Sequence, residues 1–244
     1  MEKRILGNSG LRVSRLGLGT MTWGRDTDEH EAADQLKTYL DAGGNLIDTA
    51  AMYGDGDSER VIGGFLGTLA KREDLIIATK AGISFSAGER SVNNSRSNLL
   101  ADLDKSIARL GVEYIDLWQI HTWDPMVPLE ESLSAIDQAV NSGRVRYVGV
   151  SNFSGWQLAR AATLQNPLFG KSPIISTQVE YSLLNRGIEA EVIPAAIEMN
   201  VGVLAWSPIG RGVLTGKYRS GAPSDSRGAS PHFSGFIAPY LDER

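Results

Sequence analysis

The chain has 244 residues, 42% of them hydrophobic and 22% charged, an ordinary balance for a globular protein with a sizeable core. The net charge is −5, and no Lys/Arg cluster suits a phosphate backbone, so nucleic acid is not an expected partner. The chain has no cysteine, which excludes disulfide scaffolds, thiolate zinc sites and cysteine nucleophiles. No long apolar stretch follows the N-terminus, so we expect no signal peptide, no membrane span and a cytoplasmic location.

The first predicted element is a β-hairpin, in which residues 4–6 and 11–13 flank the turn sequence Gly7-Asn8-Ser9-Gly10. Seven strand-like runs follow, and their interiors are almost continuously apolar. This pattern is typical of parallel strands that are buried on both faces. The runs are residues 16–20, 45–50, 75–80, 115–121, 147–152, 176–181 and 202–208.

Amphipathic stretches with helical spacing lie between these runs. Residues 28–40 form one such stretch, which Gly43-Gly44 ends. Two more are defined by Leu99, Leu103, Ile107 and Leu110 before Gly111, and by Leu129, Leu133, Ile136 and Val140 between Pro128 and Gly143. The alternation predicts a βα array with a parallel sheet. No linker or low-complexity segment divides it, so we predict one domain over residues 1–244.

The last part of the chain differs from the rest. Seven strands are used by Pro208, and residues 209–244 are rich in Gly, Ser, Pro and Arg, without a β-branched run that could form an eighth strand. Either the sequence is a fragment or the sheet is an open barrel. An open barrel would leave strand edges unpaired, which favours aggregation. The hairpin stands outside the array, and we expect it to plug the N-terminal end of the barrel.

Polar side chains stand at the ends of three successive strand runs. Asp48, Lys80 and His121 end or nearly end these runs, and Tyr53 follows Asp48 by five residues. Alone, each has a commoner role as a cap, a packing residue, a solvated charge or a structural hydrogen-bonding group. In a barrel, however, the C-terminal ends of the strands share one face, where the chemistry takes place. The four side chains together could protonate a carbonyl oxygen as the carbonyl is reduced.

The chemistry of the four groups fits this interpretation. A tyrosine pKa of about 10 is too high for an efficient acid near neutrality, and a nearby ammonium lowers it. The Asp48 carboxylate would keep Lys80 charged, and the His121 imidazole would orient the carbonyl or help relay the proton. An aldolase that forms a Schiff base on Lys80 is an alternative, but it leaves the other site residues unexplained.

Residues 43–54, Gly-Gly-Asn-Leu-Ile-Asp-Thr-Ala-Ala-Met-Tyr-Gly, closely resemble the first signature of the aldo-keto reductases. Thr79-Lys80 and Gln119-Ile120-His121 resemble the later catalytic strand ends, and the resemblance runs from residue 3 to residue 227. It is strongest to bacterial reductases and to members related to the potassium-channel β-subunits. It implies a (β/α)8 TIM barrel with an N-terminal β-hairpin, lacking in this chain the eighth strand and terminal helices. It also implies a tetrad of Asp48, Tyr53, Lys80 and His121, with Tyr53 as the proton donor.

The same resemblance implies NADP(H) as cofactor. Ser151-Asn152 and Gln178 would hold the nicotinamide amide, Trp206 would stack on its ring, and the glycine-rich loop after Trp206 would approach the pyrophosphate. The expected cofactor residues are Thr20, Met21, Asp48, Ser151, Asn152, Gln178, Trp206, Ser207, Pro208, Ile209, Gly210, Lys217 and Arg227. Without the resemblance, Ser151-Asn152 is equally a helix cap and Trp206 a core residue. No Gly-x-Gly-x-x-Gly motif lies between a predicted strand and a predicted helix, so the sequence does not support a Rossmann domain. We also expect no metal ion.

Trp23 and Trp123 follow the first and fourth strand runs and are the candidate substrate residues. They suggest an apolar or aromatic carbonyl compound, although loop tryptophans can equally serve as packing. The predicted function is NADPH-dependent reduction of an aldehyde or ketone. The alternative is a non-catalytic cofactor-binding or regulatory subunit, or an incomplete barrel that needs its missing C-terminal segment. The family's adenosine-binding segment has no counterpart here, so a preference for NADP over NAD does not follow from the sequence. The sequence does not indicate the oligomeric state either.

Overall fold

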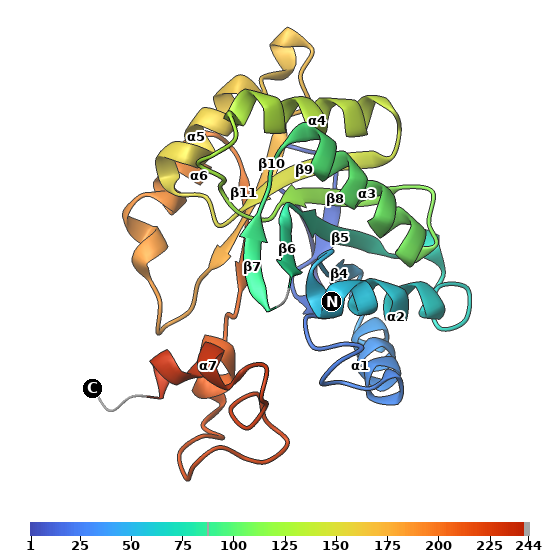
Figure 1. Cartoon of the computed structure of the whole chain (residues 1–244), viewed down its shortest axis with the longest axis vertical. Coiled ribbons are helices and arrows are strands. Elements are labelled where there is room, and N and C mark those ends of the chain that lie inside the picture. Colours follow the sequence, from blue (N-terminus) through green and yellow to red (C-terminus); the bar gives the residue numbers. More distant parts are fainter. Residues whose placement is uncertain (87, 242–244) are drawn as a thin grey trace.

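The computed structural model, which describes residues 1–86 and 88–241, contains a curled sheet of seven parallel strands (Figure 1). The strand order is β11-β10-β9-β8-β5-β4-β3, and every neighbouring pair is parallel. The strands are β3 (Gly17–Gly19), β4 (Leu46–Asp48), β5 (Ile76–Ala81), β8 (Ile115–Ile120), β9 (Val145–Ser151), β10 (Ile174–Glu180) and β11 (Gly202–Trp206). All seven predicted runs are therefore confirmed as strands of one sheet. Within the described residues β3 and β11 are its two end strands.

Six helices alternate with the strands and lie around the outside of the curled sheet (Figure 1). They are α1 (Glu29–Asp41), α2 (Asp57–Phe65), α3 (Arg96–Leu110), α4 (Leu129–Asn141), α5 (Gly155–Leu164) and α6 (Val192–Glu198). The predicted stop at Gly111 is confirmed, since this residue ends α3 with a φ of +64°. The Asp28 side chain caps the start of α1 by accepting from the Glu31 amide. None of these helices combines the length and apolar character that a membrane crossing requires, as far as the described residues show.

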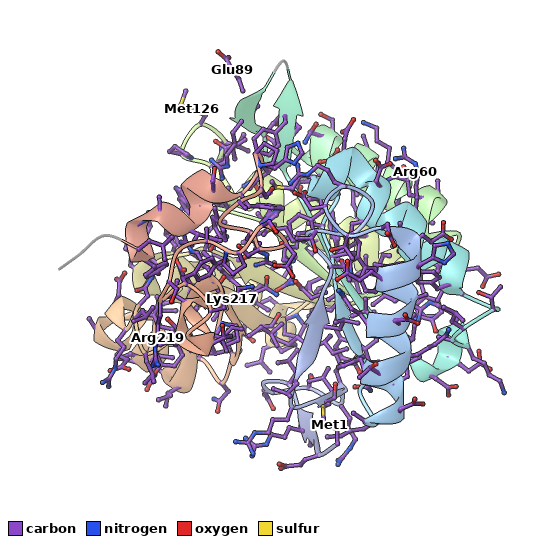
Figure 2. All side chains as sticks on the ribbon, turned by 90° about the horizontal axis from the view of Figure 1, so that it is seen from below. Met1, Arg60, Glu89, Met126, Lys217 and Arg219 are labelled. Atoms are coloured by element: carbon purple, nitrogen blue, oxygen red, sulfur yellow. The ribbon has the colours of Figure 1, made fainter. Side chains whose placement is uncertain are left out.

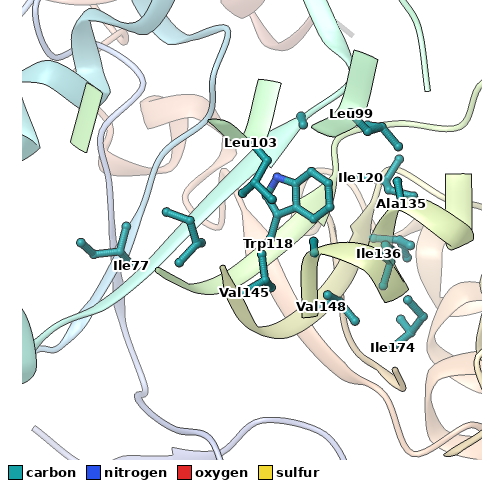
Figure 3. Close-up of a cluster of buried hydrophobic side chains, with 14 of the residues drawn as sticks. Ile77, Leu99, Leu103, Trp118, Ile120, Ala135, Ile136, Val145, Val148 and Ile174 are labelled. Carbon is teal, nitrogen blue, oxygen red and sulfur yellow. The ribbon is translucent and has the colours of Figure 1, made fainter. Parts of the chain in front are cut away.

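The main core lies between the helices and the outer face of the sheet (Figure 3). Trp118 and Ile120 of β8 point outward and pack against buried side chains such as Leu103 of α3 and Ile136 of α4. Because side chains alternate along a strand, Leu117 and Gln119 point to the inner face. The same alternation places Asp48 and Lys80 inside the barrel, which positions the candidate site.

The N-terminal hairpin forms as predicted, from β1 (Lys3–Ile5) and β2 (Arg12–Ser14). Leu6, Leu11 and Val13 pack with buried residues at the beginnings of the barrel strands, including Leu46 and Ile175. Gly7 adopts a φ of +55°, and a Cβ there would lie 2.2 Å from the Ile175 carbonyl oxygen. The hairpin therefore closes the N-terminal end of the barrel, and chemistry is left to the opposite end.

Two further features complete the architecture. A second hairpin, β6 (Ile83–Ser86) with β7 (Glu89–Val92), follows β5 directly and was not predicted. Its outer end is marked by Glu89 in Figure 2. After β11, the described residues contain only short helices, namely η5 (Gly210–Thr215), α7 (Ser234–Ile237) and η6 (Ala238–Tyr240). Figure 2 shows Lys217 and Arg219 of this segment on the opposite side of the view from Arg60 of α2. The remaining 3₁₀ turns are η1 (Tyr53–Gly56), η2 (Arg72–Asp74), η3 (Pro167–Phe169) and η4 (Gly187–Ala190).

Candidate active site

A buried ion pair joins the first two members of the tetrad. Asp48 ends β4 and Lys80 stands on the adjacent β5, so both side chains point into the barrel near its C-terminal end. The Lys80 ammonium donates to Asp48 Oδ2 and to the Thr49 carbonyl oxygen, each at 2.8 Å, and Lys80 is only 1% exposed. Burial alone would lower the pKa of Lys80, but the negative charge of the Asp48 carboxylate outweighs it and the pKa is raised. Lys80 is therefore a fixed positive charge.

Tyr53 lies above this pair, at the start of η1, where Gly54 and Asp55 turn the chain with φ angles of +58° and +54°. The Lys80 Nζ atom lies 5.1 Å from the centre of the phenol ring. Burial raises the pKa of Tyr53, and Lys80 opposes this only in part. The expectation that the ammonium would bring the pKa below its ordinary value is thus wrong, because desolvation of the phenolate is the larger effect. Tyr53 keeps its proton at neutral pH.

His121 follows β8 directly and is 8% exposed. Its ring meets the Tyr53 ring edge to face, with 6.0 Å between the ring centres and 78° between the planes. Burial, together with the positive charges of Lys80 and Arg90, lowers the pKa of His121 well below its ordinary value of 6.5. Nδ1 is buried and has no hydrogen-bond partner among the residues that the structure describes. A neutral imidazole beside a phenol suits recognition of an uncharged carbonyl group.

The lowered pKa of His121 leads to a prediction about stability. Below about pH 6.5 the unfolded chain binds a proton at His121 that the folded chain does not bind, so this residue destabilises the fold as pH falls. We expect His121→Asn to lose less unfolding free energy than the wild type between neutral pH and mildly acidic pH, as measured by urea unfolding. His30→Asn, at an exposed position of α1, is the control and should follow the wild type. Equal pH dependence for His121→Asn and the wild type would contradict the prediction.

Polar groups from four strands extend the site beyond the tetrad. Gln178 Nε2 of β10 donates to Asp48 Oδ1 at 2.8 Å, and Ser151 Oγ of β9 donates to the Gln178 carbonyl oxygen at 2.9 Å. Asn152 Nδ2 donates to the His121 carbonyl oxygen, and Asn152 Oδ1 accepts from Trp206 Nε1, both at 3.0 Å. On the other side of Asp48, Thr20 Oγ1 donates to its carbonyl oxygen at 3.1 Å. The structure thus brings five of the expected cofactor residues other than Asp48 into one network with the tetrad: Thr20, Ser151, Asn152, Gln178 and Trp206.

The Trp206 ring also has neighbours that the sequence did not indicate. Phe236 of α7 stacks on it, with 6.1 Å between ring centres and 23° between planes. Arg211 lies 3.8 Å from the centre of the Phe236 ring and pairs with both carboxylate oxygens of Glu180 at 2.8 Å. Tyr240 completes the cluster by donating to Glu180 at 3.0 Å. The segment after β11 therefore folds back onto the C-terminal end of the barrel.

The other expected cofactor residues are less closely tied to the tetrad. Ser207, Pro208, Ile209 and Gly210 follow Trp206 and lead into a turn with positive φ at Gly210, Arg211 and Gly212. Lys217 is exposed, and a Cβ at Gly212 would lie 3.3 Å from its Cε atom. Arg227 lies close enough to Tyr53 to be among the charges that lower the pKa of the phenol. Met21 is partly exposed next to Thr20.

The two candidate substrate residues lie in packed surroundings. Trp23 is 1% exposed, donates to Gln35 Oε1 at 2.9 Å and meets Phe65 edge to face at 5.9 Å, so its ring offers no free surface to a substrate. Trp123 is partly exposed and packs edge to face on Phe153 and Trp156, each with 5.3 Å between ring centres. The aromatic contacts of the described residues pair neither ring with Tyr53 or His121, and both rings pack against other side chains.

Comparison with known proteins agrees with this geometry. Residues 15–237 match the aldo/keto reductase family, and the chain belongs to that family. It is similar to the uncharacterized oxidoreductase YrpG of Bacillus subtilis, with 40% identity over 89% of this chain and 69% of the relative. It is also similar to a probable voltage-gated potassium channel subunit beta of Oryza sativa, with 35% identity over 96% of this chain and 72% of the relative. The solved structure of the thermostable aldo-keto reductase Tm1743 with the inhibitor epalrestat superposes with a TM-score of 0.75 and 34% identity, covering 90% of this chain and 77% of that one.

Proposed function

We propose that this protein reduces an aldehyde or ketone to the alcohol, with NADPH as hydride donor and Tyr53 as the acid that protonates the carbonyl oxygen. The observation that carries the proposal is the buried Lys80–Asp48 ion pair, 2.8 Å long, beneath a protonated Tyr53 and beside a neutral His121. Membership of the aldo/keto reductase family supports oxidoreductase activity on carbonyl compounds.

Each tetrad residue has a part in this chemistry. The Tyr53 hydroxyl donates its proton, and the Lys80 ammonium stabilises the phenolate that remains. Asp48 keeps Lys80 charged and in place, since it binds the ammonium on one oxygen and Gln178 on the other. His121, neutral in its buried position, orients the carbonyl by a hydrogen bond. The raised pKa of Lys80 disfavours the aldolase alternative, because a Schiff base needs an uncharged amine.

The residues around Trp206 fit a nicotinamide coenzyme, which would supply the hydride when bound. The Trp206 indole at the end of β11 offers a stacking surface, and the partly exposed Arg227 offers a positive charge. The glycine-containing turn 210–212 has backbone that a ligand can approach closely. Ser151, Asn152 and Gln178 would hold the amide end of the coenzyme, with Thr20 and Met21 beside it. Lys217 and Arg227 would meet its phosphates. Phe236, which stacks on Trp206, would have to leave part of that surface.

Two measurements on the full chain test the proposal. NADPH titration should quench tryptophan fluorescence, and Trp206→Phe should lose a large part of the quenching. NADPH should then be oxidised when a simple aromatic aldehyde is added. Coenzyme binding without turnover would instead favour the regulatory alternative, which the likeness to a channel subunit supports. If the chain neither binds NADPH nor oxidises it, both proposals are contradicted.

A further inference from the structure

The first turn of α2 contains two buried polar residues that the tetrad does not include. Ser58 and Glu59 are both 0% exposed, five and six residues after Tyr53. They lie on the same side of the helix as the core residues Ile62 and Phe65. Polar side chains on the apolar face of a helix are unusual, and a fully buried carboxylate must be compensated by its partners.

Ser58 links α2 to the end of β4, which carries Asp48, and to the end of the adjacent strand β3. Its hydroxyl lies 2.7 Å from Thr20 Oγ1 and 2.9 Å from Thr49 Oγ1, and it donates to the Thr20 carbonyl oxygen at 2.9 Å. Thr49 follows Asp48 directly, and its carbonyl oxygen accepts from the Lys80 ammonium. A single side chain thus holds the ends of β3 and β4 together from outside the barrel.

Glu59 ties the same helix to β5. Thr79 Oγ1 donates to Glu59 Oε1 at 2.6 Å, and Arg109 of α3 binds Oε2 at 2.6 and 2.7 Å. Thr79 directly precedes Lys80, so its side chain points outward where that of Lys80 points into the barrel. Gly56 makes room for this arrangement, because a Cβ there would lie 2.5 Å from Arg109 Cδ. Both oxygens of the carboxylate therefore have partners, one of which is the residue beside Lys80.

We infer that Glu59 is a positioning residue. It sets the distance between Tyr53 and Lys80 by binding the Thr79 hydroxyl on the outer face of β5. The physical basis is the short covalent connection between Tyr53 and Glu59 on one side, and between Thr79 and Lys80 on the other. The hydrogen bond between Glu59 and Thr79 joins these two connections, so that it links the position of Tyr53 to that of Lys80. Small errors in the placement of reacting groups reduce turnover strongly even when the residue changed does not touch the substrate.

Thr79→Val tests this inference, because it removes the hydroxyl while keeping the shape and the Glu59–Arg109 pair. We expect kcat to fall by about 10- to 100-fold with little change in coenzyme Kd, and Thr79→Ser to restore most of the activity. Thr177→Val is the matched control: Thr177 is equally buried on β10, and its hydroxyl has no partner within residues 1–86 and 88–241. It should behave as the wild type.

A second readout does not depend on turnover, since the kinetic test alone rests on the proposed function. Ultraviolet titration of tyrosinate, taken as the difference from Tyr53→Phe, follows ionisation of Tyr53 by itself. The titration of Tyr53 should move to higher pH in Thr79→Val, as Lys80 moves away from the phenol, and should return in Thr79→Ser. If the wild type is inactive, the proposed function fails but this titration still decides the inference.

The inference is overturned if Thr79→Val matches Thr177→Val in kcat and leaves the Tyr53 titration unmoved. If Thr79→Val does not fold, Glu59→Asp replaces it. That change keeps the negative charge next to Arg109 but shortens the reach to Thr79, and it should produce the same upward shift in the titration. A folded Glu59→Asp with an unchanged Tyr53 titration would equally overturn the inference.

Discussion

Tyr53→Phe is expected to lower kcat by about 10²- to 10⁴-fold, the range over which a positioned acid contributes to catalysis. Coenzyme Kd should change little, because the substitution removes only the phenolic hydroxyl. Steady-state NADPH oxidation with an aromatic aldehyde, together with a coenzyme titration, measures both quantities. Tyr114→Phe is the control, because Tyr114 lies between Arg72 and Arg146, away from the tetrad. A Tyr53→Phe variant as fast as the wild type would rule out the proposed acid.

The pH dependence of the wild type follows from the same residue. The acid form of Tyr53 is required, and burial raises the pKa of this group above its ordinary value of 10.0. Tyr53 therefore keeps its proton near neutrality, and its ionisation should reduce activity only when the pH rises past this raised pKa.

Asp48→Ala is expected to destabilise the fold by about 3–5 kcal/mol, because it leaves the Lys80 ammonium buried without its counter-charge. In the wild type Lys80 has a fully buried side chain and a 2.8 Å contact to Asp48. Urea unfolding measures the change. Asp48→Ala/Lys80→Met should recover part of the loss, since it removes the unpaired charge as well.

A surface ion pair provides the control for this prediction. Asp34 and Lys37 lie 3.8 Å apart, with side chains 81% and 55% exposed. Asp34→Ala should therefore cost less than about 1 kcal/mol. If Asp48→Ala is no more destabilising than Asp34→Ala, the buried Lys80 ammonium does not depend on Asp48 for its counter-charge, and the prediction is wrong.

Much of the fold could be predicted from local patterns. Parallel strands buried on both faces are almost continuously apolar, so the runs that became β4, β5, β8 and β9 stand out in the sequence. The tetrad was predictable for a related reason: a polar residue that ends such a run must lie at the C-terminal end of the barrel. Position along a strand therefore determines which face Asp48 and Lys80 share.

Other features depend on contacts that no local pattern contains. The net shift in the pKa of Tyr53 reflects burial by distant segments, whereas the sequence showed only the nearby ammonium. Phe236 packs on Trp206 across 29 intervening residues, and no regular motif in the sequence links the two. Trp23 follows a strand, which suggested a substrate residue, but α1 and α2 bury it. Ser58 and Glu59, in contrast, form a local signal, because they are two adjacent polar residues on the apolar side of α2.

Transfer of deuterium to benzaldehyde from NADPH labelled at both C4 positions follows the proposed hydride transfer itself. We expect the wild type to form benzyl alcohol with deuterium on the carbinol carbon, and Tyr53→Phe to give a yield reduced by about 10²-fold or more. Alcohol formed without deuterium, or an equal yield from the two proteins, would contradict this expectation.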